Sequence, residues 1–274
     1  MRQSTIQYLS PAGLEGVELL FCPDSGFNFA PHFHEAYCIW LNTDGAELYS
    51  QRGTTDILNP GSFGIVAPGD VHANRAISDS GRRLLTFYVQ EAQIRPLLSE
   101  TGGKSETLFN SGFYHDPECF GLLARLFSVL STSPSVIEKE SAFLEVFALL
   151  AGRHGLVRPH ASYRAGDSRR IRETVRLFRD RLGESITLGE IAQGLCCTPY
   201  HLIRSFKKEC GLSPHAYLLR LRLEKARELI RQGLPLVEVA LQAGFADQSH
   251  LTRHFKTNYG ITPGGFRQQM LGLS

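Results

Sequence analysis

The sequence lacks the features that mark membrane-bound and secreted proteins. No apolar run among its 274 residues reaches the ~20 residues needed to cross a bilayer, so we expect no membrane partner. The N-terminal stretch MRQSTIQYLSPAGLEG has no uninterrupted apolar core of the kind that a signal peptide needs, so we expect a cytoplasmic protein. Low-complexity segments and acidic tails are absent too. A cytoplasmic globular protein is the class that remains.

Cysteine is sparse, and its spacing argues against the common metal and disulfide frameworks. The six cysteines lie at positions 22, 38, 119, 196, 197 and 210, without a CxxC pair or a zinc-like spacing with histidine. Reduced structural thiols are the default in a cytosolic chain. We interpret the adjacent Cys196 and Cys197 as a buried pair in a helix turn, with a redox switch as the alternative. The sequence predicts no cofactor.

Charge is unevenly distributed along the chain, whose length is comfortable for two domains. Residues 168–274 hold 17 lysines and arginines against 9 aspartates and glutamates, a net charge of +8. Residues 1–167 hold 12 against 18, a net charge of −6. A basic C-terminal part is what phosphate binding requires, because most of the affinity for DNA is electrostatic. The acidic N-terminal part should be repelled by DNA and needs another role.

One C-terminal stretch, Gly244 to Arg267, has the signals of a short helix with two different faces. Asp247 is a suitable N-cap, and Gly260 stands where a helix ends in a left-handed residue. One stripe is apolar and recurs at i, i+4 and i+8: Leu251, Phe255 and Tyr259. The opposite stripe is polar and basic: Ser249, Thr252, Arg253 and Lys256. Such a helix either enters a DNA major groove or lies on a solvated surface.

The same pattern occurs 49 residues upstream, in the stretch TPYHLIRSFKKECGLSP of residues 198–214. The apolar stripe repeats in Leu202 and Phe206, and the terminating glycine repeats in Gly211. The polar stripe repeats as well: Tyr200, Ile203, Arg204 and Lys207. A repeated apolar stripe needs only a shared fold, whereas a repeated Arg and Lys on the outer stripe indicates a shared role. The repeat favours two DNA-reading helices.

Further helices are expected around these two stretches. A capping box, Thr187 with Glu190, opens a short helix before the first stretch, and a second short helix is expected over Leu236–Gln242. Each short helix followed by a longer one is typical of a helix-turn-helix unit. A first helix is expected from a cap at Ser168, and a spacer helix with two apolar sides is expected over Pro214–Arg231. On the remaining, charged face of the spacer we place Arg220, Glu224, Arg227, Glu228 and Arg231.

The N-terminal part has the pattern of many short strands followed by helices. Tyr37, Ile39 and Leu41 alternate with Cys38 and Trp40, which predicts a half-buried strand. Further strands are expected over residues 46–52, 62–67, 71–76 and 82–90, which suggests a sandwich or barrel. Two apolar helical stripes follow between residues 94 and 153. This helical pair either covers an open end of the barrel or pairs with its copy in a second subunit.

Histidines gather at two turns of these strands, in PHFHE (31–35) and PGDVHAN (68–74). This pattern resembles the two motifs of cupin barrels, of which metal-binding members carry a further glutamate. Ile39 stands at that position here, and only Glu35 and Glu47 are near. We therefore favour a metal-free small-molecule pocket over a metal site made by His32, His34 and His72. A third reading has the histidines capping strand ends. The expected effector-binding residues are His32, His34, Tyr37, Trp40, His72 and Asn74.

The C-terminal part, ending GFxDQSHLxRxFKxxxGxTPxxFR, resembles the DNA-binding domain of the AraC/XylS family of transcriptional regulators. The resemblance implies an α+β protein of two domains. Residues 1–155 form a cupin-like antiparallel β-barrel with appended helices that binds an effector and dimerises. Residues 156–167 form a linker, and residues 168–274 an all-α double helix-turn-helix domain. The implied function is transcription regulation in response to a small molecule.

The resemblance also assigns DNA contacts, position by position. The base-facing candidates are Tyr200, Ile203, Arg204, Gln248, Ser249, Thr252 and Arg253. The phosphate-facing candidates are Lys207, Lys208, Lys256 and Thr187. The expected partners are double-stranded DNA, a small-molecule effector, a second copy of the chain, and RNA polymerase if the protein is an activator. Two other functions remain open: a metal-dependent cupin enzyme fused to a DNA-binding domain, and a DNA-bending protein without an effector.

Overall fold

The chain folds into two compact units, residues 1–160 and 161–274. The computed structural model describes residues 6–77, 81–99, 107–157, 167–184 and 186–272. The division falls inside the segment 156–167 that was expected to link two domains, and most of that segment lies outside the described residues. Each unit has its own core and is described by itself.

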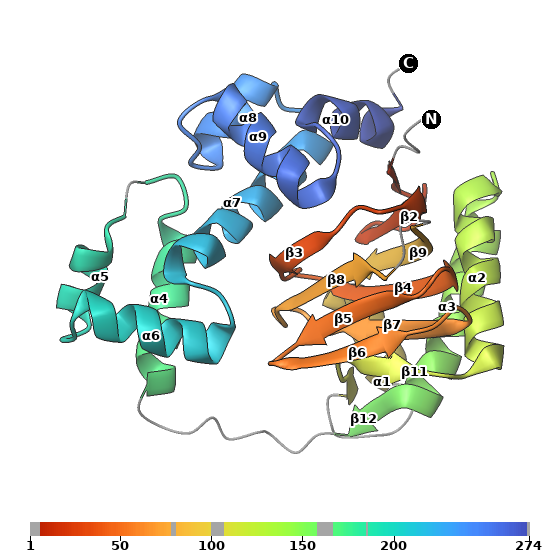
Figure 1. Cartoon of the computed structure of the whole chain (residues 1–274). Helices are drawn as coiled ribbons and strands as arrows, with labels where there is room; N and C mark the ends of the chain where they lie inside the picture. The colour runs from red at the N-terminus through yellow and green to blue at the C-terminus, as the bar shows by residue number, and fades with distance from the viewer. Residues whose placement is uncertain (1–5, 78–80, 100–106, 158–166, 185, 273–274) are drawn as a thin grey trace. The chain divides into compact units, whose positions relative to one another are not determined.

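Two antiparallel sheets build the first unit (Figure 1). The six-stranded sheet has the order β1 (Gln7–Leu9), β2 (Val17–Ser25), β9 (Arg82–Val89), β4 (Tyr37–Asp44), β7 (Ser62–Val66) and β11 (Gly112–Tyr114). The four-stranded sheet has the order β3 (Phe29–His32), β8 (His72–Ala76), β5 (Glu47–Gln51) and β6 (Thr54–Leu58). A small third sheet pairs β10 (Thr107–Phe109) with β12 (Gly155–Val157). The predicted α+β fold class is confirmed.

The barrel expected from the sequence is not closed. A closed barrel needs a continuous hydrogen-bond ladder around the whole sheet. Within the described ranges, the ladders stop at β1 and β11 in one sheet and at β3 and β6 in the other. The first unit is therefore cupin-like in its layers but open at its strand edges.

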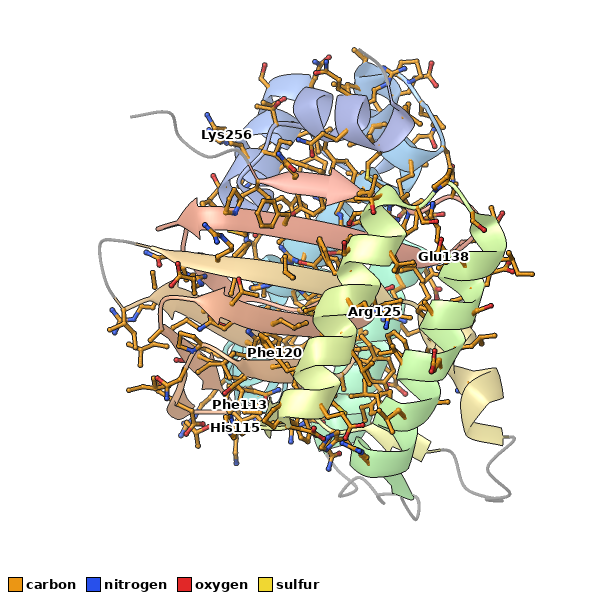
Figure 2. The ribbon with its side chains drawn as sticks, turned by 90° about the vertical axis from the view of Figure 1, so that its right-hand side faces the viewer. Phe113, His115, Phe120, Arg125, Glu138 and Lys256 are labelled. Atoms are coloured by element: carbon orange, nitrogen blue, oxygen red, sulfur yellow. The ribbon has the colours of Figure 1, made fainter. Side chains whose placement is uncertain are left out.

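Three helices accompany the sheets: α1 (Glu91–Ser99), α2 (Pro117–Thr132) and α3 (Val136–His154). Figure 2 shows α2 and α3 lying across the strands of the six-stranded sheet. Their buried side chains, such as Leu123 and Phe147, share one core with Phe63 and Phe87 of the sheet. The helical pair thus covers the face of a sheet in its own chain, and not the end of a barrel.

Strand β4 is buried on both of its faces. Tyr37, Ile39 and Leu41 belong to the core under α2 and α3. Cys38 and Trp40 point to the other side, toward the four-stranded sheet, and are equally buried. The expected half-buried strand is therefore wrong, because helices cover one face and a second sheet covers the other.

Seven helices make up the described part of the second unit. They are α4 (Asp167–Asp180), α5 (Leu188–Gly194), α6 (Pro199–Cys210), α7 (Pro214–Arg231), α8 (Leu236–Gln242), α9 (Gln248–Tyr259) and α10 (Pro263–Leu271). The structure confirms the two short helices, the two longer helices that follow them, and the spacer α7. The first helix begins at Asp167, so Ser168 lies inside it and is not its cap.

The spacer helix α7 buries charge that the sequence placed on an exposed face. Arg220 and Arg227 are each 3% exposed, and both pair with Glu224 at 3.3 and 3.2 Å. Their guanidinium groups lie over the ring of Tyr259, 5.2 and 4.9 Å from its centre. The Tyr259 hydroxyl donates to Glu224 as well. These contacts attach α9 to α7, which is why the two arginines face inward.

A core substitution tests the packing of α2 on the sheet. Leu123 is fully buried in that core, whereas Leu144 on α3 is 49% exposed. We expect Leu123→Ala to lower the free energy of unfolding by about 2–5 kcal/mol. Leu144→Ala, the matched control, should change it by less than about 0.5 kcal/mol. Urea unfolding followed by the fluorescence of Trp40, the single tryptophan, reports the first unit alone. Equal shifts in the two variants would contradict this core.

Candidate DNA interface and ligand pocket

The start of α5 is fixed by local hydrogen bonds, and the turn to α6 follows at its other end. Thr187 accepts from the backbone N–H of Glu190 at 3.2 Å, and its own N–H donates to the Glu190 carboxylate at 2.9 Å. This capping box holds the pKa of Glu190 below its ordinary value, because the Thr187 N–H stabilises the charged form. Cys196, in the turn, has a left-handed backbone (φ 51°) and is exposed, so the predicted burial of the cysteine pair is wrong.

The two reader helices, α6 and α9, begin and end in the same way. Thr198 accepts from the backbone N–H three residues on at 3.2 Å, and Asp247 does the same at 2.7 Å. Gly211 and Gly260 end the helices in left-handed conformations, with φ of 76° and 71°. The repeat seen in the sequence is therefore a repeat of structure down to its caps.

Each reader helix separates an inner stripe from an outer one. The inner side chains are buried: Leu202, Phe206, Leu251, Phe255 and Tyr259. The predicted DNA-contacting side chains are on the outer stripe and exposed, except Thr252, which is half-buried: Ile203, Arg204, Lys207, Lys208, Gln248, Ser249, Arg253 and Lys256. Thr187 is exposed at the start of α5, and the Tyr200 side chain lies outside the described residues. The structure thus brings the predicted contacts onto two matching helix faces.

The cations of the outer stripes differ from several cations elsewhere in this unit, which form ion pairs on their own helices. Arg169, Arg176 and Lys225 pair with carboxylates on their own helices. In the described part of the chain, Arg204 and Arg253 form no ion pair, and neither do Lys207, Lys208 and Lys256. Exposed cations without a carboxylate partner are available for phosphate and base oxygens.

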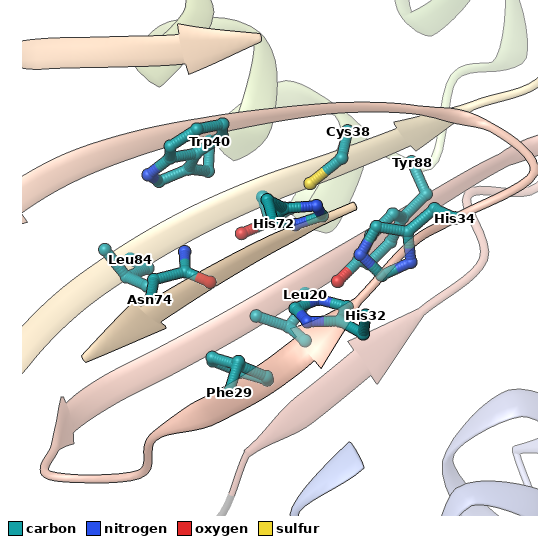
Figure 3. A pocket seen from close by; sticks show the side chains of 11 residues that line it. Leu20, Phe29, His32, His34, Cys38, Trp40, His72, Asn74, Leu84 and Tyr88 are labelled. Atoms are coloured by element: carbon teal, nitrogen blue, oxygen red, sulfur yellow. The ribbon is translucent and has the colours of Figure 1, made fainter. Parts of the chain in front are cut away.

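A pocket lies between the two sheets of the first unit (Figure 3). Side chains from both sheets and from the loop after β3 line it: Leu20, Phe29, His32, His34, Cys38, Trp40, His72, Asn74, Leu84, Thr86 and Tyr88. In Figure 3, His32 and His34 lie at one end, and Leu84 and Asn74 at the other. The space left among these side chains is small and holds little more than a water molecule.

The structure gathers five of the six predicted effector residues and excludes one. His32, His34, Trp40, His72 and Asn74 all line the pocket. Tyr37 lies on the other face of β4, with its ring perpendicular to that of Phe109 at 5.7 Å. The reason is the two-residue period of a strand, which sends Tyr37 and Cys38 to opposite faces. The same period could have predicted that Cys38 lines the pocket, and that Leu84, Thr86 and Tyr88 of β9 do so too. The sequence analysis did not include these four residues.

The three histidines form one cluster in which a ring nitrogen of each lies within 4.8 Å of the others. His32 Nδ1 lies 2.7 Å from the Ala30 carbonyl, and His72 Nδ1 lies 3.1 Å from the Asp70 carbonyl. A carbonyl can only accept, so these contacts assign the proton of each neutral ring to Nδ1 and leave Nε2 as an acceptor. Histidine ligands of metals are oriented in this way, so two of the three imidazoles, those of His32 and His72, have the orientation that suits a metal.

No carboxylate joins this cluster among the described residues. Ile39 is in the core on the far face of β4, and Glu35 is exposed. Glu47 is fully buried but is engaged elsewhere. It accepts from Trp40 Nε1 at 2.5 Å and pairs with Arg82 Nε at 2.7 Å. The ligands that this cluster offers a metal are therefore three imidazoles, which would leave the other coordination positions of the metal open.

The Glu47–Arg82 pair connects the two sheets, and the sequence did not reveal it. Both side chains are 0% exposed. Burial raises the pKa of Glu47, and the neighbouring Arg82 charge opposes this rise. Trp40 and Asn74, which line the pocket, both hydrogen-bond Glu47. The ion pair is thus in direct contact with the pocket walls.

The two units together define a helix-turn-helix DNA-binding protein with a ligand-binding domain. Models of known families match both parts: the AraC-like ligand binding domain over residues 16–147, and a helix-turn-helix domain over residues 191–269. The chain belongs to the AraC/XylS family of transcriptional regulators. In the described ranges, no helix combines the length and the apolar character that crossing a membrane requires.

Relatives and solved structures agree with this membership. The regulator YbfI of Bacillus subtilis is 28% identical over 224 residues, which cover 81% of each chain. The transcriptional activator NphR of Rhodococcus is 27% identical over 257 residues, covering 86% of this chain and 70% of that one. The crystal structure of a point variant of ToxT from Vibrio cholerae matches with a TM-score of 0.62 at 12% identity. The match covers 93% of this chain and 98% of that one. This last likeness shows a shared fold.

Proposed function

We propose that the protein reads a specific DNA site with α6 and α9 and that a small molecule in the first unit's pocket controls this reading. The duplicated outer stripe carries the proposal. Two helices with the same caps and the same buried stripe also expose Arg and Lys at the same positions. A surface helix needs no such agreement on its solvent side. Reader helices that enter successive major grooves do need it.

Individual contacts follow from the chemistry of base edges. Arg204 and Arg253 suit the O6 and N7 atoms of guanine, because a guanidinium can donate to both at once. Gln248 suits adenine, and Ile203 and Thr252 suit thymine methyl groups. Ser249 and Tyr200 complete the proposed base-facing set. The proposed phosphate contacts are Lys207, Lys208, Lys256 and Thr187, which set the position of the helices and not the sequence read.

The protein's partners are also proposed. NphR is a transcriptional activator by name, and so is RhaS of Citrobacter koseri, 30% identical over half of this chain. An activator's partner is RNA polymerase, and we extend this role to the present chain. A second copy of the chain is proposed as well, supported by the exposed apolar side chains Val136 and Ile137 at the start of α3. The proposed compartment is the cytoplasm, where the DNA is.

Arg253→Ala tests sequence reading. We expect a loss of about 1–3 kcal/mol in binding to the specific site, with relaxed selectivity at one base pair. Arg176→Ala is the matched control, because Arg176 is exposed on α4 and pairs with Asp180. The measurement is the affinity of the full-length protein for its specific DNA site and for variants of that site in which one base pair is changed. Equal weakening on every sequence would remove Arg253 from the base contacts.

Lys256→Ala tests phosphate contact. Each lysine at a phosphate releases counterions, so its loss should lower the slope of log K against log salt by about 1. Affinity should fall on all sequences alike. Lys225→Ala is the control, because it removes the same charge from α7, where Lys225 pairs with Glu228 at 3.0 Å. An unchanged salt slope in the Lys256 variant would exclude this contact.

The histidine cluster supports a second candidate, a metal-dependent cupin enzyme fused to a DNA-binding domain. Three clustered imidazoles, two of them oriented by backbone carbonyls, can hold a metal that activates a bound small molecule. For a regulator with a metal-free pocket, we expect no stoichiometric metal in purified protein. Elemental analysis decides between them. Near-stoichiometric iron, manganese or nickel that is lost in His34→Ala, but kept in the His201→Ala control, would favour the enzyme.

A further inference from the structure

The buried guanidinium of Arg82 lacks most of the acceptors that it needs. Its Nε pairs with Glu47, and the side chain is 0% exposed. Neither Nη1 nor Nη2 has a hydrogen-bond acceptor anywhere in the described chain. Buried donors are nearly always satisfied in folded proteins, and an unsatisfied charged donor is especially costly. This arginine therefore calls for an acceptor that comes from outside the chain.

The position of Arg82 connects it to the pocket. On β9, Arg82 lies on the same strand face as Leu84, Thr86 and Tyr88, which line the pocket. Its guanidinium carbon lies 5.9 Å from the centre of the Phe29 ring, another lining residue. Arg82 thus lies two residues before Leu84 on β9, and Leu84 is at the end of the pocket away from His32 and His34 (Figure 3).

We infer that the effector is a compact monocarboxylic acid whose carboxylate binds Nη1 and Nη2 of Arg82 and whose apolar part lies against Leu20, Phe29 and Leu84. This inference rests on the proposed function and names its ligand class. The forked donors of a guanidinium match the two oxygens of a carboxylate.

Charge and size narrow the ligand class. No arginine or lysine of the described chain lines this pocket itself; Arg82 lies beside the lining residue Phe29, and Glu47 already balances its charge. One added negative charge can be accommodated there, whereas a phosphate with about two negative charges would meet the Glu47 carboxylate without a second cation. The small free space requires a short molecule and a shift of the lining side chains on binding.

Glu47 competes with the bound acid for Arg82. Glu47→Gln removes the competing charge and keeps the shape of the side chain, so carboxylate affinity should rise. Arg82→Met alone would leave Glu47 buried without its partner, and such a variant can fail to fold. The double variant Arg82→Met with Glu47→Gln removes both charges together, which the fold should tolerate, and should bind no carboxylate preferentially.

Calorimetric titration of the full-length protein tests the inference, with formate, acetate, propanoate and benzoate, each compared with its primary amide. We expect at least one acid to bind at least tenfold more tightly than its amide, which is a difference of about 1.4 kcal/mol in the free energy of binding. Glu47→Gln should increase that preference, and the double variant should abolish it while retaining the wild-type circular dichroism spectrum of the folded protein.

Three outcomes would overturn the inference: equal binding of acid and amide, a preference that survives in the double variant, or no binding of any acid in the panel. Specific DNA binding, measured on the same preparations, separates this result from the proposed function. If the acids do not bind as expected but the wild-type protein still binds its specific DNA site, only the proposed ligand class is refuted. Failure of DNA reading in the wild-type protein would refute the function itself.

Discussion

The burial of β4 on both faces is the constraint on which the first unit depends. One face carries Ile39 and Leu41 into the core under α2 and α3. The other carries Cys38 and Trp40 into the pocket. A shift of one residue along this strand would exchange the two sets and destroy both, since side chains alternate with a period of two. The pocket is therefore held in place by the same register that builds the core.

Polar groups inside the two units have different consequences. In the second unit, Arg220 and Arg227 share the Glu224 carboxylate and lie over the ring of Tyr259, and these contacts attach α9 to the spacer α7. In the first unit, Glu47 satisfies only part of Arg82. Buried contacts between helices favour a rigid platform for reading DNA, whereas buried donors that lack an acceptor beside a pocket favour binding of a ligand.

The sequence by itself determined the second unit almost entirely. Its helices are specified locally, by caps such as Thr198 and Asp247, by the glycines that end them, and by stripes of 3.6-residue period. Repetition at a distance of 49 residues then linked the two reader helices without any knowledge of their contacts. Local rules failed only where tertiary partners intervened, as for Arg220 and Arg227, whose inward direction depends on α9.

Only the tertiary structure decided the pocket. Strand pairing joins residues far apart in the chain, so the sequence could group His34 and His72 only through the resemblance to cupins, whereas the contact between their rings is set by the fold. It could not show that Tyr37 faces helices, because the helices that cover it begin eighty residues later. Nor could it pair Glu47 with Arg82, since that contact crosses from one sheet to the other. Contacts between sheets carry no local signal, and the pocket of the first unit is made of them.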